Sequence, residues 1–139
     1  MTIHTRSQKY AAAALSRINA IKDDANLRDE YKSRADSFSV MVMQAGLAQG
    51  LGFLQAKGTD KNNKKTAYGY YLDDLAAVLK AGDATTANNG EQLQQSAIAA
   101  SLTDYRLLTR ETLVAAGWLK RFGQAYIKKD SISSQGART

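Results

Sequence analysis

Apolar residues recur at helical spacing along most of this 139-residue chain. Two segments near the amino terminus each repeat apolar residues three or four positions apart, which places them on one face of an α-helix. These stripes are Tyr10, Ala14, Ile18 and Ile21 in the first segment, and Tyr31, Ala35, Phe38 and Val42 in the second. Thr5 or Ser7 can cap the first helix, and the second is expected to begin near Leu27 or Arg28.

The same periodicity predicts four further helices between polar loops. The first of them follows Gly46, which is either a break or a continuation of the preceding helix, and ends near Gly58. The next runs from Ala67 to Lys80, another begins at Glu91, and the last runs from Tyr105 to Tyr126. The fourth helix should bury Tyr68, Tyr71, Leu72, Leu75 and Leu79, with Asp73 and Asp74 facing water, and the fifth should carry Leu93, Ala97, Ile98, Leu102 and Tyr105 on its apolar face. No segment alternates with period two over a useful length, so the predicted fold class is all-α.

The segment from Tyr105 to Tyr126 predicts a helix with two different faces. Thr109 can cap it and Glu111 would then stand in its first turn, where an acid is favoured. The expected buried stripe is Val114, Trp118, Phe122 and Ala125, and a separate basic line is Arg110, Arg121 and Lys128 with Lys120 at its edge. We therefore expect Trp118 to anchor the core rather than to stack on a base.

Residues 37–56 carry no charge over a length close to that of a bilayer span. Serine, glutamine and glycine residues interrupt this stretch, which favours a buried helix or helix pair over a membrane helix. The amino terminus has no apolar run of signal-peptide type, so a cytoplasmic protein is expected. The length predicts one compact domain of about six helices over residues 1–130, with a disordered tail at 131–139.

The composition argues against an enzyme. The chain has no cysteine, which excludes disulfides and thiolate chemistry, and its one histidine, His4, lies near the amino terminus. Neighbouring acids such as Asp23 and Asp24 point about 100° apart on a helix and form no carboxylate pair. The glycines between residues 46 and 52 lack the lysine and hydroxyl residue of a phosphate loop. We therefore predict no catalytic residue, no metal site, no cofactor and no small-molecule substrate.

Basic residues carry the remaining chemistry. The chain has 19 Lys and Arg against 13 Asp and Glu, a formal charge of +6, which permits a polyanionic partner. The candidate phosphate contacts are Arg110, Lys120 and Arg121 in the last helix, Arg6, Lys9 and Arg17 on one side of the first, and Lys57, Lys61, Lys64 and Lys65 in the loop before residue 67. Loop lysines also serve simply to keep a surface solvated, so both interpretations stay open for them.

Two blocks of residues resemble a known family. One block is Tyr105-Arg106, Leu108-Thr109-Arg110-Glu111, Trp118-Leu119-Lys120-Arg121-Phe122 and Ala125; the other is Glu30-Tyr31, Gly46-Leu47, Gln49, Leu51, Phe53-Leu54 and Lys57-Gly58. Together they are similar to the signature of the small helical subunit of the type III-B CRISPR (Cmr) RNA-targeting effector complex. Tyr10 and Ala11 fit the looser amino-terminal block of that family.

This resemblance implies a non-catalytic subunit that stacks in several copies beside the backbone and large subunits and lines the channel for the guide RNA and target RNA duplex. Because base pairing reads the sequence, such a subunit needs mainly phosphate contacts. Arg110, Lys120 and Arg121 match the signature and also project from the expected stripe. The alternative is a helical protein adaptor whose basic face meets an acidic partner without RNA. Neither interpretation involves a membrane.

Overall fold

The computed structural model describes residues 2–128, and within that range it confirms the all-α prediction with six helices and no strand. The helices are α1 (Arg6–Ile21), α2 (Arg28–Ala45), α3 (Leu47–Ala56), α4 (Ala67–Ala81), α5 (Gly90–Ala99) and α6 (Leu102–Tyr126). An isolated antiparallel bridge joins Thr59 and Lys65 in the loop between α3 and α4. The tail predicted at 131–139 lies outside the described residues.

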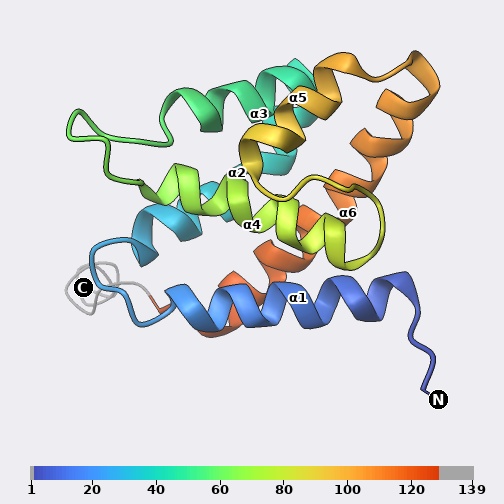
Figure 1. Ribbon diagram of the computed structural model, residues 1–139. Coiled ribbons are helices and arrows are strands. Elements are labelled where there is room, and N and C mark those ends of the chain that lie inside the picture. Colours follow the sequence, from blue (N-terminus) through green and yellow to red (C-terminus); the bar gives the residue numbers. More distant parts are fainter. Residues whose placement is uncertain (1, 129–139) are drawn as a thin grey trace.

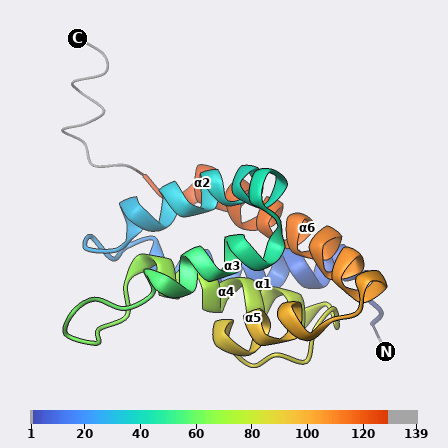
Figure 2. The same cartoon turned by 90° about the horizontal axis from the view of Figure 1, so that it is seen from above.

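Helix α4 lies at the centre of the fold and packs against each of the other five helices. Helix α1 lies below it, α3 pairs with α5 above it, and α6 crosses diagonally from the end of α5 down to α1 (Figure 1). Seen from above, α2 runs along one side of the molecule and α5 along the other (Figure 2). The core therefore collects around α4, and the 25-residue α6 reaches from the α5 end of the fold towards the end where α1 finishes.

The stripes predicted for α1 and α2 are confirmed, since all eight of their residues are buried. The Thr5 hydroxyl accepts a hydrogen bond from the Gln8 backbone N–H, and the Gln8 side chain accepts one from the Thr5 N–H. This reciprocal cap starts α1 where its stripe begins. In the core, the rings of Tyr31 and Phe38 each meet Tyr71 edge-on at 5.5 Å between centroids, a geometry that aromatic pairs favour.

Gly46 separates α2 from α3. Its φ of +92° lies in a region that residues with a side chain rarely adopt, so the chain breaks there instead of continuing one long helix. The uncharged stretch 37–56 thus forms the second half of α2 and all of α3, and a Cβ on Gly50 would press on Phe38 and Val42 of α2. The sequence left open a single buried helix or a helix pair, and the structure shows the pair. Across residues 2–128, no helix combines the length and apolar character that a bilayer crossing requires.

The prediction that Asp74 faces water is wrong. Asp74 is only 8% exposed, and its carboxylate accepts a 2.6 Å hydrogen bond from the Tyr31 hydroxyl while the Arg17 Nε lies 3.6 Å away. Because α4 packs against all five other helices, the polar position of Asp74 also meets neighbouring helices, and the carboxylate is retained there by these two partners. Its neighbour Asp73 stays partly exposed and accepts hydrogen bonds from the Gly90 N–H and Lys65.

Burial raises the pKa of Asp74 to about 6, although the Tyr31 hydroxyl and Arg17 both act to lower it. The folded state then binds more protons than the unfolded chain between about pH 4 and pH 6, because an unfolded aspartate titrates near pH 3.9. The contribution of Asp74 to the free energy of unfolding should therefore increase as the pH falls, by about 1 kcal/mol between pH 7 and pH 5.

Asp74→Asn should abolish this increase, since the amide still accepts from Tyr31 but does not titrate. Urea unfolding of both proteins at pH 7 and pH 5 measures the effect, because titrations elsewhere in the chain cancel in the difference. Asp29→Asn, at an exposed position of α2, is the matched control and should follow the wild type. Parallel pH dependence in wild type and Asp74→Asn would show that Asp74 is ionised throughout this range.

Candidate nucleic-acid interface

Helix α6 carries the main candidate contacts, and it begins earlier than predicted. The Ser101 hydroxyl caps it by accepting a hydrogen bond from the Asp104 N–H, so the helix starts at Leu102. Thr109, predicted as the cap, instead lies inside the helix and donates its hydroxyl proton to the Tyr105 carbonyl oxygen. The predicted fifth helix is correspondingly shorter: it ends at Ala99, and its expected apolar residues Ile98 and Leu102 are mostly exposed.

The buried stripe predicted for α6 is also wrong. Val114 is 41% exposed and Ala125 is exposed, while Trp118 and Phe122 are half-buried at the edge of the core. The face that packs on the other helices consists mainly of smaller residues: Leu108, Glu111, Thr112, Ala115, Ala116, Leu119 and Gly123. Small side chains let α6 approach α1, α2 and α4 closely, whereas the prediction gave most weight to the largest apolar residues.

The outer side of α6 presents the basic residues. Arg110 and Arg121 are exposed, and Lys120 is half-buried. Arg110 Nε lies 3.6 Å from the Glu111 carboxylate, but no carboxylate of residues 2–128 lies within ion-pair distance of Lys120 or Arg121. These cations therefore keep their charge available for an external anion, as phosphate binding requires.

Glu111 of α6 is a nearly buried carboxylate that contacts residues of α1 and its neighbour Arg110. It is only 9% exposed, accepts a 2.8 Å hydrogen bond from the Tyr10 hydroxyl, and lies 3.5 Å from Arg6 NH1. Burial, with the bond to Glu111 as a second cause, raises the pKa of Tyr10 well above its usual range, so Tyr10 remains the proton donor at neutral pH. This contact could not be predicted from sequence patterns, because the two residues stand 101 positions apart.

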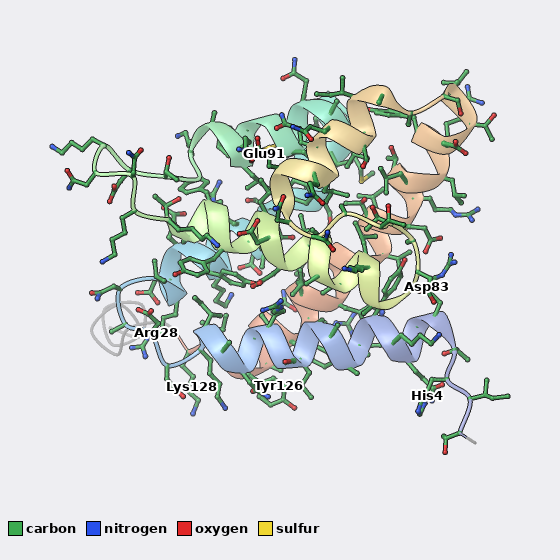
Figure 3. All side chains as sticks on the ribbon, in the orientation of Figure 1. His4, Arg28, Asp83, Glu91, Tyr126 and Lys128 are labelled. Atoms are coloured by element: carbon green, nitrogen blue, oxygen red, sulfur yellow. The ribbon has the colours of Figure 1, made fainter. Side chains whose placement is uncertain are left out.

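The three basic candidates of α1 are each paired with a carboxylate. The pairs are Arg6 with Glu111 at 3.5 Å, Lys9 with Asp83 at 3.6 Å, and Arg17 with Asp74 at 3.6 Å. Arg6 Nε also donates a 2.9 Å hydrogen bond to the Gly82 carbonyl oxygen. Figure 3 shows Asp83 at the turn after α4, above the amino-terminal part of α1. These cations thus hold α1 to α4, α6 and the turn, which reduces the charge they offer to a ligand.

The loop between α3 and α4 keeps its four lysines exposed, as predicted. Lys65 forms a 2.6 Å ion pair with Asp73 and lies over the Tyr70 ring, and Lys57 lies over the rings of Phe53 and Tyr68. Lys61 and Lys64 have no carboxylate within ion-pair distance among residues 2–128.

The backbone of this loop is held in place by Asp60, whose carboxylate accepts hydrogen bonds from the Asn62 and Lys64 N–H groups. The loop projects beyond the ends of α3 and α4, on the side away from the turn after α4 (Figures 1 and 2). The ten candidate residues therefore occupy three places: the outer side of α6, the contacts of α1, and this loop.

No cluster of three or more acidic or histidine side chains in residues 2–128 is placed to hold a metal ion. His4 lies exposed ahead of α1, apart from the acidic residues of the turn after α4 (Figure 3).

Comparison with known proteins gives consistent matches. Residues 6–126 match the model of a family described as CRISPR-associated protein (Cas_Cmr5). The CRISPR system Cmr subunit Cmr5 of Thermus thermophilus is 38% identical over 128 residues, which cover 91% of this chain and all of that protein. A crystal structure of a CRISPR-associated Cmr5 family protein from the same organism superposes with a TM-score of 0.78 at 36% identity, over 91% of this chain and all of that one.

Proposed function

We propose a function from one premise: this chain belongs to the Cmr5 family of CRISPR-associated proteins. The family resemblance predicted from the sequence is thereby confirmed, and the chain is a structural subunit of the Cmr CRISPR system. Beyond this, we propose that it acts in the cytoplasm as a non-catalytic part of the ribonucleoprotein effector, where several copies stack and line the channel for the guide RNA and target RNA duplex.

The observation that carries this proposal is the outer side of α6. Arg121 and Lys120 have no carboxylate partner among residues 2–128, and Arg110 stands on the same side with only a long contact to Glu111. An RNA duplex or strand bound without sequence preference is held mainly through its phosphates by such residues. Lys61 and Lys64 offer a second phosphate-binding group, whereas Arg6, Lys9 and Arg17 would contact RNA only in addition to their internal ion pairs.

Stacking of identical copies also fits the physical requirements. A head-to-tail contact joins two different patches of the same chain and can repeat along a filament without closing. If each copy turns its basic side to the channel, the few cations of every subunit add up to a basic surface along the duplex.

Purification from cells that express a complete Cmr system tests the proposal. The tagged full-length chain should recover guide RNA together with the backbone and large Cmr subunits. Nuclease treatment before elution separates RNA-dependent contacts from protein contacts. Recovery of an acidic partner that withstands nuclease, without guide RNA or other Cmr subunits, would instead establish the adaptor function.

A further inference from the structure

A shallow hollow of about 230 Å³ lies on the outer side of α6. Its lining residues are Val114, Gly117, Trp118 and Arg121, all from one stretch of the helix. Trp118 is half-buried, and its ring lies 5.6 Å from that of Phe122, which supports it from the following turn. The hollow therefore has a glycine floor, an aromatic and an aliphatic wall, and a cation at its rim.

Nothing in residues 2–128 explains the glycine at position 117. A Cβ added at Gly117 would meet no atom within 4 Å, whereas one at Gly69, Gly82 or Gly90 would approach a neighbour more closely than 3 Å. Glycine in the interior of a helix is destabilising relative to alanine, because it leaves the backbone freer in the unfolded chain. Since neither packing nor backbone conformation calls for glycine here, the open space over Gly117 is available to a molecule outside the chain.

The charge around the hollow indicates an anion. Arg121 stands at the rim without a carboxylate partner among residues 2–128, Arg110 lies on the same side about 10 Å from Gly117 along the helix axis, and no acidic residue lines the hollow. A flat indole beside a cation is the combination that holds a nucleotide, with stacking on the ring and a phosphate on the arginine. A helix from an acidic protein would use the arginines but would leave the indole without a flat partner.

We infer that this hollow binds one unpaired nucleotide of an RNA strand, with its sugar over Gly117, its base against Trp118 and its phosphate on Arg121. This inference rests on the proposed RNA-binding function and assigns it a specific contact. It also gives α6 a reason to leave Val114 exposed and Trp118 half-buried beside its basic residues.

Intrinsic fluorescence tests the contact directly, because Trp118 is the only tryptophan of the chain. A 12-nucleotide oligouridine titrated into the full-length protein at low salt should quench the fluorescence to saturation. Gly117→Leu fills the hollow and should weaken binding roughly 10-fold and remove the quenching, since loss of one stacked base costs about that much. Gln95→Leu adds an apolar side chain at an exposed position of α5 and should leave both unchanged.

Gly117→Ala separates binding from folding. The methyl group has free space in the protein, so Tm should rise by about 4 °C, while RNA binding should weaken as the sugar loses its close approach. Unchanged affinity and quenching in Gly117→Leu would overturn the nucleotide site. The proposed function would still stand if Arg110→Ala with Arg121→Ala weakened RNA binding in the same assay. If Gly117→Leu lost self-association, measured by sedimentation, but kept its RNA affinity, the hollow would be a contact between copies and the nucleotide site would be overturned.

Discussion

Glu111→Ala should lower the free energy of unfolding by roughly 3 kcal/mol, the largest stability effect we expect from a single polar residue of this chain. The substitution removes the acceptor of the Tyr10 hydroxyl, and Tyr10 is only 1% exposed, so the hydroxyl would remain buried without a partner. It also removes the carboxylate that faces Arg6 and Arg110, leaving two cations close together without their shared counter-charge.

Urea unfolding at pH 7 measures this loss, and two further variants identify its cause. Glu111→Gln keeps an acceptor for Tyr10 but not the charge, and should therefore lose less than Glu111→Ala. Glu91→Ala removes an exposed carboxylate from the first turn of α5 and should cost under about 1 kcal/mol. If Glu111→Ala were as stable as Glu91→Ala, the contact between α1 and α6 would not depend on this carboxylate.

Glu111 joins the core of the fold to its basic surface. The same carboxylate accepts from a core tyrosine of α1 and faces an arginine of α6 that is proposed to contact RNA. Glu111→Ala should therefore lower stability and also remove the carboxylate that contacts Arg110. The prediction that Glu111 stands in the first turn of a helix is wrong, because α6 begins at Leu102; its observed role is a contact between distant segments.

The helices near the amino terminus were predictable because each one displays a single apolar stripe. In α1 and α2 the large residues of the stripe are also the buried ones, and local capping by Thr5 agrees with the start of the stripe. The sequence located a possible break at Gly46 but did not distinguish a break from a continuous helix, because only the backbone conformation shows that the chain leaves the helix there.

The prediction of buried residues failed for helices that pack against several other helices as well as facing solvent. Helix α6 packs mainly through small residues and a buried acid, while Val114 is exposed and Trp118 is only half-buried at the edge of the core, so residue size did not mark the inner face. Asp74 was misplaced for a related reason: α4 is surrounded, and the partners that satisfy its carboxylate come from α1 and α2, far away in sequence. The ten basic candidates could be listed from the sequence, but the ion pairs that several of them form could only be seen in three dimensions.

The second large effect that we expect is on the affinity for RNA, through the arginines of α6. Arg110→Ala with Arg121→Ala should weaken binding of a guide–target RNA duplex, held by the Cmr backbone subunit, by roughly 10-fold or more at low salt, because each arginine forms charge-assisted contacts to a phosphate. Each lost phosphate contact should also reduce the slope of log affinity against log salt concentration by about 0.7 to 0.9.

The matched control removes the same number of charges elsewhere. Lys22→Ala with Lys80→Ala changes the C-terminal end of α1 and the last turn of α4, outside the surface proposed to face RNA. It should change the affinity little and leave the salt slope almost unaltered, since distant surface charges are largely screened. Comparison of the two double variants thus separates specific phosphate contacts from a general effect of net charge.

The most direct test of the central proposal is the salt dependence of duplex binding for the wild type and these two double variants in the presence of the backbone subunit. We expect a slope smaller by about 1.4 to 1.8 for Arg110→Ala with Arg121→Ala, and a slope close to wild type for the control. Equal affinities and equal slopes for all three proteins would contradict the assignment of α6 as the surface that meets RNA.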